Sequence, residues 1–279
     1  MKKYFKLILF IPLLFLFSCN TESPTKSETN QSMSKTDGLK IVSWNIQNLG
    51  KSKLKNDTIL EYIAKTINPY DIVAIQEVST DIYGAKAIAK LDAILDRMGS
   101  KWDYTISDPT EGSGKERYAY LFKTSKVKLE KAFLETVFQT SIQREPYLAY
   151  FKYNGSDYAL FNLHLVPEDK NPGKEAEALC LLDRFGGKTI ILGDFNLSQN
   201  STSFNCLKKS YRPSLVDEKT SLKMKKKEGE VLNKEYDNAF FSNDTKLLSS
   251  KVIHFYKDFS SLEEARKISD HCPILIIVD

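Results

Sequence analysis

The sequence contains little histidine, cysteine or tryptophan, and its charges nearly cancel. Its 279 residues include three histidines, four cysteines and two tryptophans, with 40 basic against 36 acidic side chains. A mean hydropathy of −0.35 excludes a polytopic membrane protein. Lys2, Lys3 and Lys6 precede an apolar segment that we expect to be removed, which leaves 40 − 3 = 37 basic residues against 36 acidic ones. Because this balance is close to zero, any affinity for a polyanion must come from local patches.

The N-terminus is typical of an export signal. A short basic region, residues 1–6, precedes an apolar run, residues 7–17, that is too short to span a membrane. The run ends at Ser18 and Cys19, a small residue directly before a cysteine, which resembles the cleavage site of a bacterial lipoprotein. We therefore expect an exported protein anchored to a membrane through a lipidated Cys19, facing the periplasm or the cell exterior of a bacterium. The alternative is an ordinary cleaved signal with an incidental cysteine.

The segment after Cys19 is polar and lacks an apolar period. Residues 20–37 are rich in Ser, Thr, Lys, Glu and Asn, and such a composition cannot bury enough surface to fold. No second linker and no internal repeat follow. The predicted organisation is a signal peptide (1–18), a lipidated cysteine with a flexible tether (19–38) and one folded domain (39–279).

Three cysteines remain in the predicted domain, Cys180, Cys206 and Cys272. None has metal-ligand spacing, so burial as a small apolar residue is the default expectation for each. Export permits a disulfide, but an odd number leaves at least one cysteine without an internal partner. The sequence leaves open whether Cys180 and Cys206 are bonded.

Apolar periodicity predicts alternating strands and helices in the folded part. Asn56 or Asp57 is expected to cap a helix that Asn68-Pro69 ends, and a second helix is expected to end at Gly99. A further helix is predicted over residues 176–185. Strands are predicted over residues 39–46, 71–76, 102–107, 118–122, 147–153, 158–164, 189–192, 236–241, 252–255 and 273–278. Strands with helices beside them indicate two packed sheets with helices outside.

Polar residues capable of chemistry recur where these apolar strands end. An acid at a strand end is usually only a solvated boundary residue, but strand ends gathered at one edge of a sheet form a rigid rim that suits a catalytic site. The residues at these positions are Asn45, Glu77, His164, Asp194, Asn196, Asp270 and His271.

Together these residue types suit phosphodiester hydrolysis. The carboxylates of Glu77, Asp194 and Asp270 are ligands that Mg²⁺ or Mn²⁺ accepts, and the amide oxygens of Asn45 and Asn196 can complete or orient the shell. Histidine titrates in the range needed for proton transfer. A carboxylate hydrogen-bonded to such an imidazole fixes its tautomer, and Glu116 and Asp237 are candidates for that role.

A series of short motifs occurs in a characteristic order. They are Trp44-Asn45-Ile46-Gln47-Asn48, Ile75-Gln76-Glu77-Val78, Lys115-Glu116-Arg117-Tyr118, Arg144-Glu145-Pro146, Leu163-His164, Gly193-Asp194-Phe195-Asn196, Tyr236-Asp237 and Ser269-Asp270-His271. From about Ile41 to Ile277 the chain resembles the endonuclease/exonuclease/phosphatase superfamily, and within it the deoxyribonuclease I branch. The resemblance implies an α/β (α+β) fold, a four-layer αββα sandwich of two packed mixed β-sheets with helices on both outer faces.

The resemblance also implies roles for individual residues. Glu77 resembles the principal metal-ligating glutamate, with Asn45 beside it, and Asp194, Asn196 and Asp270 match residues that bind metal, orient the attacking water and hold the phosphate. His164 is expected to pair with Glu116, and His271 with Asp237; which histidine is base and which is acid stays open. Arg144 resembles an arginine that contacts the nucleic-acid backbone. Arg117 and Tyr236 stand in matching motifs and are counted with Arg144 and Asn196 as substrate-binding residues. Structural Ca²⁺ sites are a feature of the branch, but the sequence does not locate any.

The chain departs from that branch at two positions. Gly114 and Ser79 stand where the branch has a tyrosine and an arginine that contact the minor groove. Because backbone contacts supply most nucleic-acid affinity, cleavage of DNA is compatible with both changes, while groove preference is not assured.

The prediction is an exported, lipid-anchored, Mg²⁺- or Mn²⁺-dependent DNA endonuclease that acts as a monomer without an obligate protein partner. The first alternative is the same chemistry on sphingomyelin, inositol phosphates or RNA, since a fold does not choose its substrate. The second is a surface binding protein without catalysis. His254 and the tyrosines near Tyr118 and Tyr120 are expected to be structural, and the basic run 223–227 is expected to be a solvated loop, although it would track a polyanion if it lay at the site rim.

Overall fold

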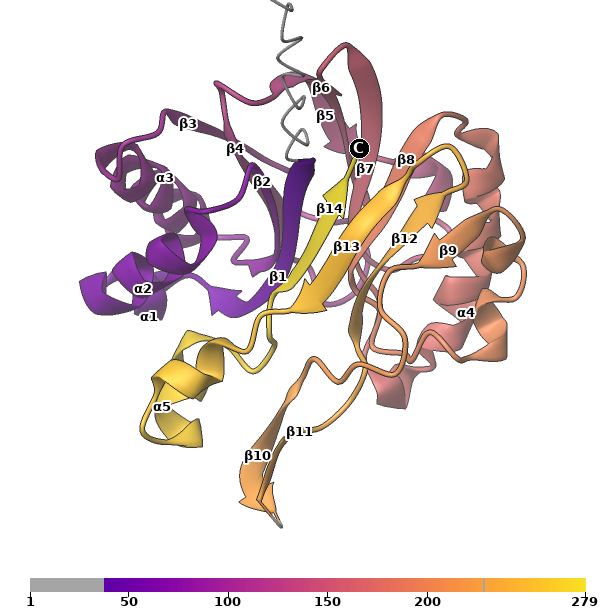
Figure 1. Cartoon of the computed structure of the whole chain (residues 1–279). Helices are drawn as coiled ribbons and strands as arrows, with labels where there is room; N and C mark the ends of the chain where they lie inside the picture. Colours follow the sequence, from indigo (N-terminus) through magenta and orange to yellow (C-terminus); the bar gives the residue numbers. More distant parts are fainter. Residues whose placement is uncertain (1–37, 228) are drawn as a thin grey trace, which may run out of the picture. The chain divides into compact units, whose positions relative to one another are not determined.

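Two six-stranded β-sheets form the centre of the described part of the chain (Figure 1). The computed structural model describes residues 38–279 apart from residue 228. The predicted signal peptide and lipidated tether lie outside the described residues. Within residues 38–279, no helix has both the length and the apolar character needed to cross a membrane.

The first sheet has the strand order β13-β14-β1-β2-β4-β3. β1 and β2 run parallel, and the other neighbouring pairs are antiparallel. Its central strands β14, β1 and β2 are mostly apolar and buried, as expected for strands that are covered on both faces. Their bounds are β1 Leu39–Leu49, β2 Ile72–Val78, β3 Trp102–Ile106, β4 Arg117–Lys123, β13 Leu247–Val252 and β14 Ile274–Val278.

The second sheet has the order β5-β6-β7-β8-β12-β9. β7 and β8 are its parallel pair, and a hairpin at Asn154-Gly155 joins β6 to β7, as the sequence predicts. The bounds are β5 Lys128–Leu134, β6 Tyr147–Tyr153, β7 Ser156–His164, β8 Lys188–Asp194, β9 Tyr211–Pro213 and β12 Asp237–Ser242. A separate two-stranded hairpin consists of β10 Leu222–Lys227 and β11 Glu230–Leu232.

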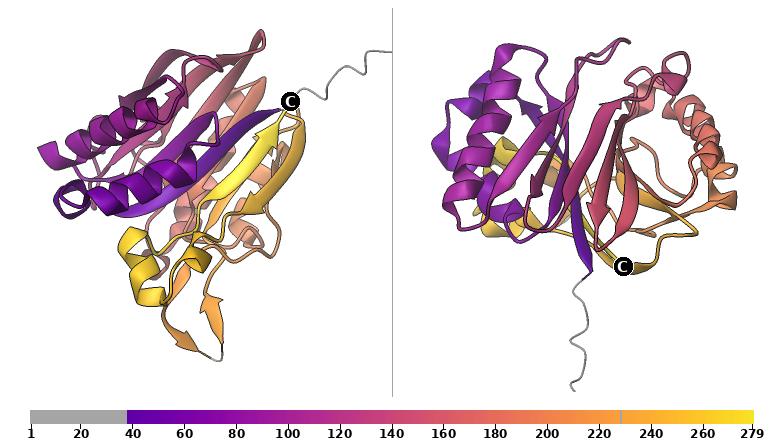
Figure 2. Two further views of the ribbon diagram at one scale, coloured as in Figure 1. Left: turned by 60° about the vertical axis from the view of Figure 1, so that its left-hand side comes forward. Right: turned by 90° about the horizontal axis from the view of Figure 1, so that it is seen from above.

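Helices cover the outer face of each sheet, so the predicted four-layer sandwich is confirmed (Figure 2). On the side of the first sheet lie α1 Lys51–Leu54, α2 Asp57–Ile67, α3 Ile82–Arg97 and α5 Leu262–Ile268. The side chain of Asn56 caps α2 by accepting a hydrogen bond from the N–H of Ile59. Outside the second sheet lies α4 Pro172–Ala178. Short 3₁₀ helices span Thr136–Phe138, Glu168–Lys170, Leu179–Arg184, Thr202–Phe204, Leu207–Lys209 and Phe255–Asp258.

The core is divided by the second sheet into two apolar clusters. The larger joins α2, α3 and the space between the sheets, and the smaller packs the second sheet against α4 and the 3₁₀ helices. Tyr118 and Tyr120 are fully buried in the larger cluster, and their hydroxyls donate to backbone carbonyls. They are therefore core residues, as predicted.

A disulfide between Cys180 and Cys206 settles the question that the sequence left open. It joins the 3₁₀ helix Leu179–Arg184 to the loop before Leu207–Lys209, so it ties together the helical layer outside the second sheet. Cys272 is the free cysteine of the described residues and is buried.

Three secondary-structure predictions are wrong. The helix predicted over residues 176–185 is α-helical only to Ala178 and then tightens into a 3₁₀ helix. The strand predicted over residues 252–255 ends at Val252, and Phe255 begins a 3₁₀ helix instead. The basic run 223–227 is not a loop, because it pairs with β11 as strand β10. In each case tertiary contacts override a weak local pattern.

The fold brings the ends of β1, β2, β7 and β8 to one end of the sandwich. The β1–β2 pairing shifts register between Asn45 and Leu49, and Gln47, Asn48 and Glu77 adopt positive φ angles of 30°, 54° and 60°. Positive φ is uncommon for residues other than glycine and clusters at functional sites. Beside this irregularity Asn45 reaches the second sheet, where its Nδ2 donates to Asp194 at the end of β8.

Candidate active site

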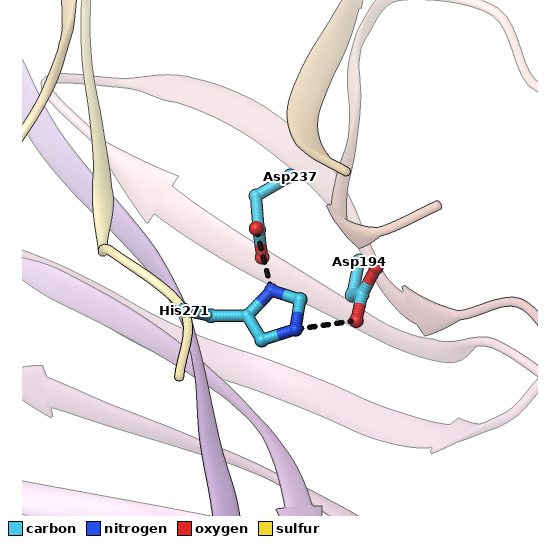
Figure 3. A group of neighbouring side chains, drawn as sticks. All are labelled: Asp194, Asp237 and His271. Carbon is cyan, nitrogen blue, oxygen red and sulfur yellow. Dashed lines mark hydrogen bonds and ion pairs between the residues drawn. The ribbon is translucent and has the colours of Figure 1, made fainter. Parts of the chain in front are cut away.

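Asp194, the last residue of β8, lies where the two sheets meet. Its side chain is 1% exposed, and its Oδ2 accepts a hydrogen bond from Nδ2 of Asn45, 3.0 Å away. Nε2 of His164 lies 3.4 Å from the same oxygen, and Nε2 of His271 lies 3.6 Å from it. Figure 3 shows the imidazole of His271 between Asp194 and Asp237. One carboxylate oxygen is therefore shared by histidines from opposite sheets.

His164 ends β7, and Glu116 holds its imidazole. Nδ1 of His164 lies 2.9 Å from Oε2 of Glu116, and the same oxygen accepts a hydrogen bond from Nη1 of Arg144 at 3.2 Å. All three side chains are buried. The other oxygen of Glu116 accepts from the backbone N–H of Glu77 at 3.2 Å. Because Nδ1 is occupied by the carboxylate, the ring is oriented with Nε2 toward Asp194.

His271 precedes β14 and is held in the same way by Asp237. Its Nδ1 lies 2.7 Å from Oδ2 of Asp237, which also accepts a hydrogen bond from Thr220 Oγ1 at 2.7 Å. The ring of Tyr236 stacks on the imidazole, with centroids 6.3 Å apart and planes 24° from parallel. The structure thus brings together the two histidine–acid pairs that the sequence analysis associates.

The electrostatics of the centre are set by buried carboxylates. Burial alone lowers the pKa of an imidazole, but Glu116 and Asp194 outweigh it and raise the pKa of His164, while Asp237 and Asp194 hold the pKa of His271 well above its ordinary value. Burial opposes the charge of Asp194, yet the two histidines hold its pKa below its usual range. For Asp237 burial prevails, and its pKa is raised.

Glu77, Asn45 and Asp194 form the oxygen-rich side of the centre. Nδ2 of Asn45 donates to Oε1 of Glu77 at 2.9 Å and to Oδ2 of Asp194 at 3.0 Å, so the amide nitrogen bridges two carboxylates. The amide oxygen accepts from the N–H of Gln47 at 3.0 Å. Carboxylate and amide oxygens fit a hard cation such as Mg²⁺ or Mn²⁺, and Asn45 would join the carboxylates as a ligand after turning its amide.

A second group also has metal-binding side chains close together. One ligand atom each of Asp194, Asp237 and His271 lies within 4.8 Å of the others. However, Nδ1 of His271 is already 2.7 Å from Asp237 and its Nε2 faces Asp194 (Figure 3). This pattern is typical of an oriented imidazole rather than of a cation site, so the oxygen-rich side fits a metal better.

Asp270 directly precedes His271 and interacts with two neighbouring side chains. Its Oδ2 accepts a hydrogen bond from Nε2 of Gln47 at 2.9 Å and lies 3.4 Å from Nη2 of Arg266. Behind Gln47, the buried ammonium of Lys53 donates to the carbonyls of Ile46 and Gln47. Burial lowers the pKa of Lys53 to about 8, although Glu77 and Asp270 oppose the shift. Lys53 therefore supports the irregular end of β1 from inside the fold, a role that the sequence analysis missed.

An open cleft of about 630 Å³ leads to the centre. Both histidines line it together with Glu77, Asp194 and Asn196, and Nδ2 of Asn196 donates to the carbonyl of Leu165 at 3.0 Å. Gly114 and Ser79, the two departures noted in the sequence, also line it. The remaining wall residues are Asn48, Gly50, Lys51, Ser52, Val78, Thr80, Lys115, Glu116, Arg144 and Pro167. Lys51, Ser52 and Lys115 supply ammonium and hydroxyl groups that the sequence analysis did not assign, although Lys115 begins one of its motifs and the other two shortly follow another.

The predicted substrate-binding residues are placed differently from one another. Arg144 lines the cleft, but its guanidinium is committed to Glu116 and to the carbonyls of His164 and Leu165. Arg117 donates to the carbonyls of Ser107 and Thr80 and does not line the cleft.

Tyr236, the third of these residues, lines a smaller hollow that also contains Asn196. Its hydroxyl donates to Oε2 of Glu168 at 2.6 Å, and Lys234 pairs with the other oxygen of Glu168 at 3.2 Å.

Comparison with known proteins agrees with this geometry. Deoxyribonuclease-1 of Bos taurus is 32% identical over 175 residues, which cover 57% of this chain and 60% of that protein. Deoxyribonuclease-1-like 1 of Cricetulus griseus is 25% identical over 263 residues, 86% of this chain and 83% of the relative. The chain thus matches somewhat less than two thirds of the length of deoxyribonuclease-1.

Solved structures share the fold. A family protein of Leptotrichia buccalis has a TM-score of 0.63 at 21% identity and covers 87% of this chain and all of its own. The mannosyl-6-phosphatase of Bacteroides thetaiotaomicron has a TM-score of 0.63 at 19% identity, with the same coverage. The sequence profile described as "Endonuclease/Exonuclease/phosphatase family" matches residues 42–271. With that match, two acid-paired histidines and a carboxylate-rich cleft, the chain belongs to the endonuclease/exonuclease/phosphatase family of hydrolases.

Proposed function

We propose that the protein is an exported, lipid-anchored, metal-dependent endonuclease that hydrolyses phosphodiester bonds of DNA. The observation that carries the proposal is the convergence of His164 and His271 on one oxygen of Asp194, beside the oxygen donors of Glu77 and Asn45. Two titratable groups of this kind, each oriented by a buried acid, serve a reaction that needs one proton removed and another delivered.

The geometry supports the following roles. One imidazole takes the proton of the attacking water at Nε2, and the other gives a proton from Nε2 to the leaving oxygen. Asp194 lies between them and orients the water, while Asn196, which lines the cleft, would contact a phosphate oxygen. Glu77, Asn45 and Asp194 would hold Mg²⁺ or Mn²⁺, with Asp270 supporting them through Gln47. The cation would neutralise charge on the phosphate.

A nucleic-acid substrate is supported by the open, partly basic cleft. Lys51 and Lys115 lie on its wall, and long polyanions bind such a surface mainly through their phosphates. The similarity to relatives named deoxyribonuclease-1 supports DNA, rather than another phosphoester, as the substrate of this protein. Gly114 and Ser79 leave the wall without the groove-reading side chains of that branch, so we expect weak sequence and groove preference.

Export and lipid anchoring rest on the signal-like residues 1–19. The disulfide Cys180–Cys206 supports an oxidising compartment, because disulfides seldom persist where thiols are kept reduced. Labelling cells with a fatty-acid analogue tests the anchor. We expect label on the protein and loss of label and of membrane association in Cys19→Ser, whereas an unlabelled, freely secreted wild-type protein would contradict the proposal.

The activity is tested with supercoiled plasmid, RNA, sphingomyelin, an inositol phosphate and a phosphomonoester in parallel, each with Mg²⁺, with Mn²⁺ and with EDTA. The proposal expects conversion of plasmid to the nicked form with either metal and none with EDTA. Faster turnover of the phosphomonoester or of sphingomyelin would mean that the protein is a hydrolase of this family whose substrate is not DNA. If none of these substrates is turned over, the proposal of an enzyme is contradicted and the alternative of a binding protein without catalysis is favoured.

A further inference from the structure

The basic hairpin formed by β10 and β11 has no place in the sandwich. It forms its own two-stranded sheet and stands away from the two main sheets, at the end opposite the C-terminus in Figure 1. We refer to these two strands, Leu222–Lys227 and Glu230–Leu232, as the arm. Four of the six residues of β10 are lysines, Lys223, Lys225, Lys226 and Lys227.

The base of the arm is joined directly to the catalytic segments. The N–H of Leu222 donates to the carbonyl of Asp270 at 2.7 Å, and Ser221, the residue before the arm, pairs with His271 in an isolated β-bridge. One residue earlier, Thr220 donates to Asp237, the acid that orients His271. The arm therefore begins at the edge of the catalytic centre.

Arg266 of α5 also binds the first two residues of the arm. Its Nη1 donates to the carbonyls of Leu222 and Lys223, and its Nη2 approaches Asp270. Backbone hydrogen bonds between Ser221 and the segment Asn233–Lys234 close the two legs of the arm. These contacts tie the base of the arm to α5 and to the segment that carries Asp270.

Two adjacent side chains of β10 are exposed. Met224 is 78% exposed, Lys225 is exposed, and among the described residues Lys225 has no acidic partner. Lys223, nearer the base, pairs with Glu230 across the hairpin at 2.9 Å. A strand of six residues extends about 20 Å, which corresponds to roughly six base pairs of duplex at about 3.4 Å each.

We infer that the arm is a substrate-binding element that contacts the phosphates of duplex DNA to one side of the bond that is cleaved. The inference rests on the proposed nuclease function for the identity of the polyanion. An anionic membrane is the other surface that the exposed Lys225 and Met224 could meet. The attachment of the base of the arm to Asp270 and His271 favours DNA, because it places the start of the arm next to one of the two catalytic histidines.

The test compares an arm variant with a control matched in charge. The arm variant is K225Q/K226Q/K227Q. The control is K128Q/K152Q/K246Q, whose exposed lysines carry the same charge. Lys128 and Lys152 lie opposite each other in the β5–β6 ladder, at the start of β5 and near the end of β6. Lys246 forms an ion pair with the C-terminal Asp279. All three therefore lie at the end of the sandwich opposite the arm.

Four quantities are measured on the full chain, one of them binding to phosphatidylglycerol vesicles. Binding of a labelled 30-base-pair duplex is followed by anisotropy in EDTA at several KCl concentrations, plasmid nicking is followed with Mg²⁺, and hydrolysis of bis(4-nitrophenyl) phosphate reports a substrate too small to reach the arm. We expect the arm variant to bind duplex about 10-fold or more weakly at low salt, and the slope of log K against log salt to fall by about 2 to 3. Its KM for plasmid should rise while turnover of the small diester stays unchanged.

Duplex affinity and salt slope equal to those of the charge-matched control would overturn the inference. So would a wild-type protein that shows no duplex binding at low salt, or an arm variant that loses binding to phosphatidylglycerol vesicles and keeps its binding to duplex. Failure of the proposed function is distinguishable, because it appears as absence of plasmid nicking by the wild type. The binding slope then still decides whether the arm contacts DNA.

Discussion

Arg144 and Glu116 form a buried ion pair, Nη1 to Oε2 at 3.2 Å, directly behind the imidazole of His164. The family resemblance predicts that Arg144 contacts the nucleic-acid backbone. In the structure its guanidinium instead donates to oxygens of the protein itself. Removing one partner of a buried pair leaves the other charge uncompensated. The pair therefore positions His164 before any substrate arrives.

Arg144→Gln is expected to lower the free energy of unfolding by about 3 kcal/mol and to lower kcat at least about 10-fold with little change in KM. Urea unfolding and steady-state cleavage measure the two effects. Arg97→Gln, on the exposed end of α3, is the control and should stay within about 0.5 kcal/mol of the wild type. A rise in KM at unchanged stability would instead support a contact between Arg144 and the nucleic-acid backbone.

His164→Ala and His271→Ala are each expected to reduce kcat by about 10²–10⁴, because each removes a proton-transfer group that no neighbour replaces. The third histidine gives a matched control. His254 lies outside the cleft, so His254→Gln should retain most of the activity. Plasmid nicking with Mg²⁺ measures all three variants. Activity that survives either alanine substitution would remove that histidine from the mechanism.

Glu77→Gln is expected to raise the Mg²⁺ concentration needed for half-maximal rate by at least about 10-fold, since it removes a charged oxygen from the proposed metal ligands. Rate is measured against Mg²⁺ at a saturating substrate concentration. Glu61→Gln, on an exposed position of α2, should leave the Mg²⁺ dependence unchanged. The same Mg²⁺ dependence in Glu77→Gln and the wild type would place the cation elsewhere.

Lys53 predicts a pH effect on stability. Its pKa is about 8 in the folded protein and about 10.4 in an unfolded chain, so the unfolded state binds the extra proton between these values. The cost of burying the ammonium is fully present below pH 8 and disappears as pH rises toward 10.4. Relative to Lys53→Met, the wild type should therefore gain about 3 kcal/mol of stability between pH 7.5 and pH 10.5.

Urea unfolding of both metal-free proteins at the two pH values checks this, because groups common to both cancel in the difference. A difference that does not change with pH would mean that Lys53 titrates normally in the fold.

Much of this protein is determined by local sequence. Asn56 before the apolar positions of α2 is a cap that the chain can form alone, and the alternating runs of β6 and β7 around Asn154-Gly155 specify a hairpin without distant contacts. The short motifs likewise carry the identities of the histidines and of their acids, because the chemistry needs those residue types. Residues such as Lys223–Lys227 had no decisive local pattern, and the strand they form depends on pairing with β11.

Only the tertiary structure decided which of these residues meet and what each is free to do. Glu116 and Arg144 are 28 residues apart, and Asp237 and His271 are 34 apart, so no local pattern fixes either contact. Arg144 is turned inward by carbonyls at the end of β7, and Lys53 reaches the strained end of β1 only because α1 folds back on it. The sequence alone determined the catalytic residue types and the class of fold. Packing of two sheets decided their distances and their charge states, since both depend on burial and on neighbours that the chain supplies from far away.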